Sequence, residues 1–318
     1  MTAETPHAAN EDDLWSGHSR ISAFYEAIVT IGLVLCAVIT ILTTVGIILV
    51  LSIQTFEFFA KSRVGILDFL LGTHLRPEAS PPEFGILPLI WGTFLIAAGS
   101  SMIALPIGLL SAIFLSEYAP RPLRGVLKPT LELLAGIPTI VYGYIALLLV
   151  TPTLKAILEP LGFRVETFNV LSACIVVGVM IIPMVSSLSE DVLGAVPRGL
   201  REAAYGLGAT KFEVSTRIVL PAALSGVVAS FILAISRAVG ETMAVVLAAG
   251  SRPQLTLNLL TSTETMTAYI VAVTGGEASY GSPEYLSLFA VGLTLFAITM
   301  LLNVISGFVL RHFREVYQ

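Results

Sequence analysis

The sequence has few charged residues: of its 318 residues, 12% are charged and 55% are hydrophobic. A soluble globular domain carries about 25% charged residues. So few charges cannot cover a folded chain in water, which excludes an ordinary soluble protein. The apolar residues lie instead in long runs, and a run of about 20 residues coiled as a helix matches the ~30 Å hydrocarbon core of a bilayer. The composition therefore predicts an all-α integral membrane protein.

Residues that bind metals or nucleotides are also scarce. The two cysteines, Cys36 and Cys174, lie inside apolar runs, and the four histidines are not spaced as metal ligands. We expect no disulfide and no metal site. The chain contains no Gly-x-x-x-x-Gly-Lys-Ser/Thr phosphate loop. We therefore expect no cofactor in this chain and no enzyme activity of its own. The net charge of −5 is mild and says little about partners, and we expect no nucleic-acid partner.

The apolar runs predict about six transmembrane helices. They cover Ala27–Ile53, Gly85–Leu115, Thr130–Val150, Val170–Leu188, a fifth span from after Pro221 to Gly250, and Tyr285–Leu310. Residues 1–20 are polar, do not resemble a cleavable signal, and are expected to form a disordered cytoplasmic tail before one membrane domain at 21–318. Gly85, Gly92 and Gly99 recur every seven residues and predict a closely packed helix face.

Lysine and arginine are distributed unequally between the two sets of connecting segments. If the N-terminus is cytoplasmic, ten lie inside and six outside, as the positive-inside rule expects. The inner set is Arg20, Arg121, Arg124, Lys128, Arg198, Arg201, Lys211, Arg217, Arg311 and Arg314, and the outer set is Lys61, Arg63, Arg76, Lys155, Arg164 and Arg252. This asymmetry predicts that both termini are cytoplasmic.

Residues 189–220 form an unusually long polar connection between two spans. It contains Glu202-Ala203-Ala204, Gly208 after three further residues, and Ile218-x-Leu220-Pro221. We expect a helix to about Leu207, a left-handed glycine at Gly208, and a second helix over 211–220, with Pro221 in the first turn of the fifth span. The segment is either a passive loop or a docking element for a soluble partner.

This spacing resembles the signature of permease subunits of ATP-binding-cassette importers. The resemblance implies the type I importer (MetI-like) permease fold. It also implies that Glu202, Ala203, Ala204 and Gly208 contact a separate ATPase subunit, with Ile218, Leu220 and Pro221 completing the motif. ATP and magnesium would then be bound by that partner.

Two opposite charges interrupt the fifth apolar run. Arg237 and Glu241 are four residues apart, so on one continuous helix they would share a face and could pair. A charge in the centre of a membrane costs about 2.5–3.5 kcal/mol on insertion scales, which favours a functional role. The pair either locks the helix bundle or forms an anion site, and an arginine fork suits phosphate oxygens. We expect Arg237 and Glu241 to lie on a substrate pathway.

Further segments resemble phosphate permease subunits of the PstC type. They are Ser236–Val245, Leu131–Gly143 and Phe114–Pro120. The resemblance implies phosphate import with a second, PstA-like permease, a homodimeric PstB-like ATPase and a PstS-like extracytoplasmic phosphate-binding protein, all at the bacterial inner membrane and in contact with its lipid. A PstA-type subunit, a permease for sulfate or molybdate, a secondary transporter and a non-transporting sensor remain alternatives.

Overall fold

A computed structural model describes residues 11–276 and 278–312, with side chains placed for 25–276 and 278–308. The chain divides into two units, Met1–Ile53 and Gln54–Gln318. Helix α1 (Glu11–Ser62) supplies the described part of the first unit, where large apolar side chains such as Ile31 and Leu42 are exposed. Residues 11–20 belong to this helix, and the disordered cytoplasmic tail expected over residues 1–20 stays a prediction. Residues 1–10 lie outside the described residues.

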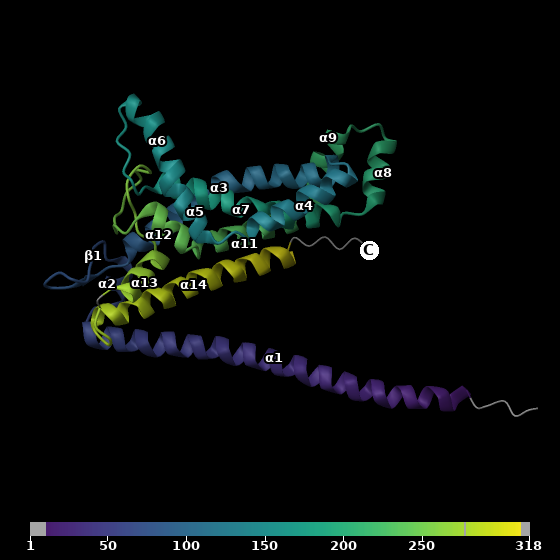
Figure 1. Ribbon diagram of the computed structural model, residues 1–318, viewed down its shortest axis with the longest axis horizontal. Coiled ribbons are helices and arrows are strands. Elements are labelled where there is room, and N and C mark those ends of the chain that lie inside the picture. The colour runs from purple at the N-terminus through teal and green to yellow at the C-terminus, as the bar shows by residue number, and fades with distance from the viewer. Residues whose placement is uncertain (1–10, 277, 313–318) are drawn as a thin grey trace, which may run out of the picture. The chain divides into compact units, whose positions relative to one another are not determined.

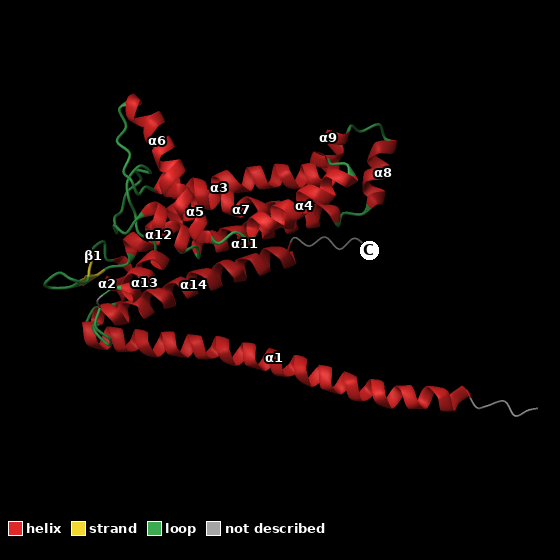
Figure 2. Ribbon diagram, viewed as in Figure 1, coloured by secondary structure: helices red, strands yellow, loops and turns green. Residues whose placement is uncertain are grey.

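The second unit consists almost entirely of helices (Figure 2). Its first part contains α2 (Ile66–Leu71), the antiparallel strands β1 (Leu75–Arg76) and β2 (Glu83–Phe84), α3 (Leu87–Ile113), the π-helix η1 (Phe114–Tyr118), α4 (Arg121–Ala135), α5 (Thr139–Ile145), η2 (Ala146–Val150), α6 (Thr151–Leu158) and η3 (Glu159–Leu161). Its second part contains α7 (Val170–Gly194), α8 (Arg198–Gly206), α9 (Lys211–Glu213), η4 (Val214–Val219), α10 (Leu220–Ala222), α11 (Leu224–Val239), α12 (Met243–Ala249), α13 (Met266–Gly275) and α14 (Pro283–His312).

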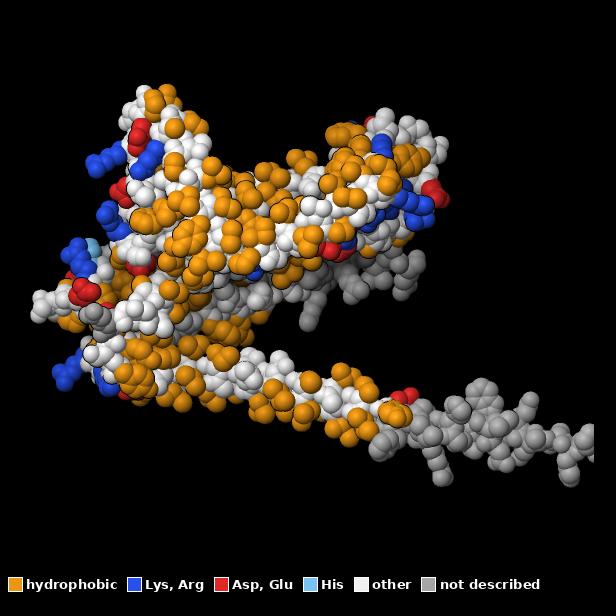
Figure 3. All heavy atoms as spheres, viewed as in Figure 1, with side chains coloured by type: hydrophobic (Ala, Val, Ile, Leu, Met, Phe, Trp, Pro, Cys, Tyr) orange, Lys and Arg blue, Asp and Glu red, His pale blue; other side chains and the backbone are white. Residues whose placement is uncertain are grey.

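Among the described residues, five helices are long and apolar enough to cross a membrane. They cover Tyr25–Ser62, Leu87–Tyr118, Thr139–Leu161, Val170–Gly194 and Pro283–Phe308. A sixth is obtained if the bent pair Lys211–Ala222 and Leu224–Val239 counts as one span. Apolar side chains cover the middle of the second unit on the face seen in Figure 3, and most charged side chains on that face lie near its two ends. The expected all-α membrane fold of about six helices is confirmed.

The third expected span begins later than the sequence predicted. Residues 121–135 form the separate helix α4, which buries none of its residues, and the span starts at Thr139. Pro138, which we expected inside the span, is the residue before the first helical turn of α5. The reason is local: Pro138 disfavours helical backbone at Ile137, so the helix that contains Leu134 ends before it.

The core of the second unit is built on α3, α7 and α11, which lie side by side (Figure 1). Small residues let these backbones approach closely. A Cβ at Gly99 would lie 2.5 Å from the sulfur of Cys174, and one at Gly92 would lie 2.3 Å from the carbonyl oxygen of Glu264. The prediction of a packed glycine face is confirmed for these two. Gly85 lies before α3 and packs against Gly72 instead.

A buried carboxylate joins α4 to α7. Glu190 is fully buried, and its oxygens accept hydrogen bonds from Arg124 and from Lys128, the latter at 2.6 Å. The Lys128 ammonium also bonds Asp191 at 2.5 Å. The hydrogen bond to Asp191, and then that to Glu190, raises the pKa of Lys128. The amphipathic helix α4, which packs against α7, is therefore held there by charge.

The packing at Gly92 predicts a stability loss. Gly92→Ala places a methyl group against the backbone of Glu264, which cannot rotate away, so we expect about 1–3 kcal/mol of destabilisation. The control is Gly125→Ala, because a Cβ at that α4 position meets nothing within 4 Å. Thermal unfolding of the purified protein in detergent measures both. An unchanged melting temperature for Gly92→Ala would contradict the close contact.

The Glu190 network gives a second prediction. Lys128→Met leaves the buried carboxylate with one of its two cations, so we expect a loss of about 1–3 kcal/mol in unfolding free energy. Because the folded pKa of Lys128 is raised, its contribution is fully present below the ordinary pKa of 10.5 and disappears as the pH rises through the higher folded pKa. Lys155→Met is the control, since Lys155 bonds a threonine hydroxyl. Equal melting temperatures for the two variants would exclude the proposed role.

Candidate functional site

Residues 198–222 form a structured segment, called here the coupling segment, at the end of the second unit opposite β1 (Figure 1). Helix α8 ends before Gly208, whose φ of +85° lies in the left-handed region that favours glycine. Thr210 and Glu213 then form a capping box that starts the next helix, which continues to Ala222. The two predicted helices and the left-handed glycine between them are confirmed.

The predicted motif residues divide between two surfaces of the coupling segment. Ala204 is buried in a cluster with Leu193 and Val214, and Ile218 and Leu220 pack partly against the same cluster. Glu202, Ala203, Gly208 and Pro221 are exposed. One face of the motif therefore fixes the segment to the spans, and the other is open.

Leu207 and Phe212 are the most exposed large apolar side chains of the coupling segment, and the motif did not identify them. Leu207 is 91% exposed and Phe212 is 67% exposed, and they lie on either side of Gly208. Both occur in a polar stretch, which is the sequence signal that could have identified them. Exposed apolar side chains in a structured segment suit docking of a soluble partner.

Arg201 anchors α8 to two spans at once. Its Nη2 donates to Oε1 of Glu117 at 2.9 Å and to the carbonyl oxygen of Leu193 at 2.8 Å, and its Nη1 donates to the carbonyl oxygen of Val196. Glu117 lies in η1, which continues α3, and Leu193 lies in the last turn of α7. In the sequence, Arg201 is recognisable only as one of the positive charges of the inner set. Residue spacing does not indicate its partner Glu117, which is 84 residues away.

Pro221 has a different position from the one expected. It lies in α10 near the end of the coupling segment, three residues before α11 begins at Leu224. Between these helices the chain bends by 73°. The proline is therefore not in the first turn of α11, although it still lies where the chain leaves the coupling segment.

The fifth expected span is broken at the two charges. Helix α11 ends at Val239, and α12 starts at Met243. Arg237 is exposed in the last turn of α11, whereas Glu241 is buried in the gap. Because no single helix carries both residues, the i,i+4 geometry is lost, and in the described part of the chain they form no ion pair. The expected pairing is wrong, and their position on a substrate pathway stays a prediction.

The Glu241 carboxylate and backbone instead stabilise the break. Oε1 accepts a hydrogen bond from the backbone N–H of Ala244 at 3.3 Å, and the Glu241 carbonyl accepts one from the Thr267 hydroxyl at 2.7 Å. Arg237 has no hydrogen-bond or ion-pair partner among the described residues. An arginine remains charged at every physiological pH and can bind an oxyanion through two parallel N–H groups. No group of three His, Cys, Asp or Glu residues in the described part of the chain could hold a metal ion.

Comparison with known sequences identifies relatives over most of the chain. Residues 104–315 match the family model described as binding-protein-dependent transport system inner membrane component. The "Probable ABC transporter permease protein YqgH" of Bacillus subtilis is 35% identical over 84% of this chain and 84% of its own length. The phosphate transport system permease protein PstC of Xylella fastidiosa (strain Temecula1) is 36% identical over 77% of this chain and 78% of its own.

Solved structures have the same fold at low sequence identity. A bacterial transporter that imports the acidic polysaccharide alginate has a chain with a TM-score of 0.60 at 14% identity, covering 95% of this chain and all of that one. A chain of an inward-facing MetNI methionine transporter has a TM-score of 0.51 at 19% identity, and the match covers 73% of this chain and 95% of that one. The expected importer fold is confirmed, and the chain belongs to the family of binding-protein-dependent transport system inner membrane components.

Proposed function

We propose that this chain is a permease subunit of an ATP-driven importer that moves inorganic phosphate across the bacterial cytoplasmic membrane. The observation that carries the proposal is the coupling segment, which is tied to the spans through Ala204 and Arg201 and leaves Glu202 and Ala203 open to a partner. A helix in this position can transmit a conformational change of a soluble ATPase subunit to the membrane spans.

Two observations support phosphate as the substrate. Several relatives that share about 35% identity over most of the chain are named phosphate transport system permease proteins, of the PstC type. In addition, Arg237 is exposed next to a break in an apolar helix, and its guanidinium has no partner among the residues that the structure describes. A PstA 1 protein of Mycobacterium tuberculosis is 33% identical over 59% of this chain, a smaller share, so the PstC type is favoured over PstA.

The proposal includes three kinds of partner. A second, PstA-like permease would complete the membrane pathway, a homodimeric PstB-like ATPase would dock on the coupling segment, and a PstS-like extracytoplasmic protein would deliver phosphate. ATP and magnesium would be bound by the ATPase, since this chain has no phosphate-loop motif. The coupling segment then faces the cytoplasm, both termini lie on that side, and the β1–β2 hairpin end faces outside.

The mechanism follows from the links between helices. Closure of the ATPase dimer would displace α8, and Arg201 would carry this displacement to Glu117 and to the end of α7. The bend before α11 and the gap at Gly240–Thr242 are the places where the fifth span can change direction. Arg237 would then bind the passing phosphate, and Glu241 would hold the break in shape.

The role of Arg237 predicts a loss of transport. Arg237→Gln removes the guanidinium, so we expect phosphate uptake to fall at least tenfold while the complex still assembles. The control is Arg252→Gln, which removes an exposed arginine whose nearest carboxylate oxygen, on Glu166, is 3.5 Å away. Uptake of radiolabelled phosphate, with sulfate and molybdate as alternative substrates, and co-purification of the subunits measure transport and assembly. Normal uptake in Arg237→Gln would remove this residue from the pathway.

Substitutions at Gly208 give a second prediction, because the backbone conformation, and not the space around the residue, limits which side chain fits there. A Cβ there meets nothing within 4 Å, but the φ of +85° strains a β-branched residue. We expect Gly208→Val to displace α8, reduce retention of the ATPase and abolish uptake. Asparagine tolerates left-handed backbone, so Gly208→Asn should keep most of the activity. If both variants transport equally well, the shape of the coupling segment is unimportant.

The same experiments separate the alternatives. A secondary transporter would work without a bound ATPase, so uptake driven by an ion gradient in the absence of ATP would favour it. A non-transporting sensor would show no uptake defect when the chain is deleted. Within an importer, the labelled substrate that accumulates distinguishes phosphate from other oxyanions.

A further inference from the structure

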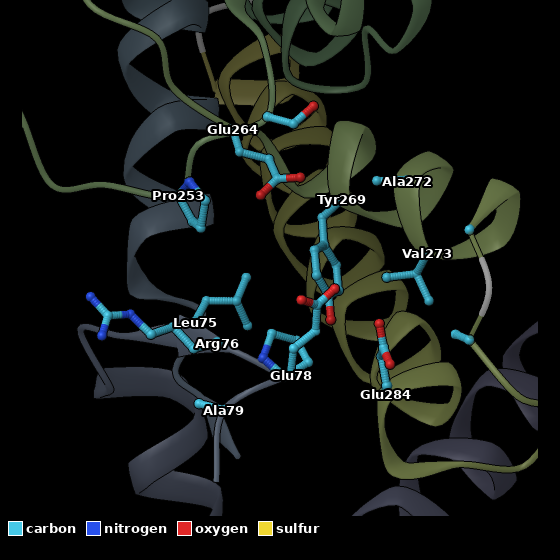
Figure 4. Close-up of a pocket in the computed structure, with 14 residues that line it drawn as sticks. Leu75, Arg76, Glu78, Ala79, Pro253, Glu264, Tyr269, Ala272, Val273 and Glu284 are labelled. Carbon is cyan, nitrogen blue, oxygen red and sulfur yellow. The ribbon is translucent and has the colours of Figure 1, made fainter. Parts of the chain in front are cut away.

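A cavity of about 650 Å³ lies at the hairpin end of the second unit, far along the bundle from the coupling segment (Figures 1 and 4). Its walls come from the loop after β1, the connection between α12 and α13, helix α13 and the first turn of α14. Three carboxylates line it, those of Glu78, Glu264 and Glu284. This cavity is called the acidic pocket below, and neither the coupling segment nor Arg237 belongs to it.

Glu264 is the central feature of the acidic pocket. The residue is 4% exposed, and its carboxylate has no hydrogen-bond or ion-pair partner among the described residues. Figure 4 shows this carboxylate directed into the cavity. Burial raises the pKa of Glu264 to about 7. Burial makes the charged form of an unpaired carboxyl costly, and a cation that enters the cavity would stabilise that charged form.

The fold holds Glu264 in this position from behind. Its carbonyl oxygen lies so close to Gly92 of α3 that no side chain fits between them. The neighbouring backbone is fixed as well, because the N–H of Met266 donates to the Thr93 hydroxyl at 3.0 Å. The Glu264 carboxylate is therefore held by the connection between α12 and α13, which packs against α3.

The other charged and polar groups around the pocket leave the acidic groups uncompensated. The guanidinium of Arg76 points away from the three carboxylates (Figure 4). The Tyr269 hydroxyl is bonded to the Ser287 hydroxyl at 2.7 Å. Glu78 is exposed at the rim and Glu284 is half-buried. The pocket therefore repels an anion such as phosphate and attracts a cation.

The volume of the acidic pocket and the positions of its carboxyl groups indicate which kind of cation it could bind. In the described part of the chain, no three carboxyl groups are placed so that they could hold a metal ion. The cavity of about 650 Å³ is lined by the apolar side chains of Leu75, Ala272 and Val273 as well as by Glu264, so it suits a side chain with an apolar stem and a charged end. Lysine and arginine have this combination of a stem and a positive head.

We propose that the acidic pocket receives a lysine or arginine side chain of the extracytoplasmic phosphate-binding protein and so holds that protein on this subunit. The inference rests on the proposed function, which places the hairpin end outside the cell. The exposed loop that carries Glu78 and the connection before α14 form the rim that an approaching protein would meet first. The rim carboxylates would steer the basic residue, and Glu264 would hold it.

The test uses the complete transporter, with its partner subunits, in lipid nanodiscs. Phosphate-loaded binding protein is added in increasing amounts, and the concentration that half-maximally stimulates ATP hydrolysis is measured. Truncating one partner of a buried charge pair weakens association strongly. We expect Glu264→Gln to raise the half-maximal concentration at least tenfold with an unchanged maximal rate, and Glu78→Gln to raise it severalfold.

Two controls keep the result interpretable. Glu159→Gln removes another exposed carboxylate outside the pocket and should change nothing. Glu78→Lys tests charge at an exposed site where folding is not affected, and it should weaken association more than Glu78→Gln. A Lys→Glu or Arg→Glu change in the binding protein should restore its association with the Glu78→Lys transporter. The same change should weaken association less with the Glu264→Gln transporter than with the wild-type transporter.

Each outcome decides the proposal. Unchanged half-maximal concentrations for both Glu264→Gln and Glu78→Lys would overturn it, while normal phosphate uptake would leave the proposed function standing. If spermidine competes for the pocket and no basic residue of the binding protein couples to Glu264, the pocket takes a free organic cation and the assignment to a protein side chain is wrong. If the wild-type transporter shows no phosphate-dependent stimulation at all, the proposed function itself fails.

Discussion

The ion pair between Arg201 and Glu117 is the interaction that fixes α8 to the rest of the second unit. It joins the short helix α8 to the ends of α3 and α7, and all three partners of the guanidinium are carboxylate or carbonyl oxygens. Both side chains are largely buried, 15% and 6% exposed. Breaking one member of such a pair typically costs about 3–5 kcal/mol, because the other charge is left in an apolar environment. Helix α8 therefore cannot shift without moving the spans to which it is tied.

The break in the fifth span serves a different purpose from that link. A continuous helix through residues 224–249 would place Arg237 and Glu241 on one face, where they would neutralise each other. Beyond the gap after Val239, Glu241 is buried and its carboxylate accepts a hydrogen bond from the Ala244 N–H. Arg237 is exposed and has no bonded partner in the described part of the chain. Backbone irregularity inside a membrane is tolerated where it is buried in protein or lines a water-filled path. An exposed cation beside such a break is what an anion pathway requires.

The membrane spans and the coupling segment could be predicted from the sequence, because apolar runs and left-handed glycines are local signals. Val170 was predicted correctly as the start of the fourth span, and Gly208 has the predicted backbone. The helix breaks were harder to predict, since Gly240 lies in an apolar run and pattern alone does not show whether the helix continues through it. The partners of Arg201 and Lys128, and the lack of a partner for Glu264 among the described residues, could not be predicted from the sequence for another reason. Each pairing, or lack of one, depends on segments that are distant in the sequence and meet only in the folded bundle.

Charge is arranged differently at the two ends of the second unit, and the arrangement fits an importer of anions. At the α8 end, Arg124, Lys128 and Arg201 are each bonded to a carboxylate, so these cations are used to hold helices together. At the hairpin end, the carboxylate of Glu264 is buried and has no cation bonded to it among the described residues. Three carboxylates and one arginine, Arg76, line the acidic pocket, so the pocket disfavours an anion. Arg237 does not line it, so a phosphate path through Arg237, as we propose, would leave the acidic pocket available to a positively charged partner.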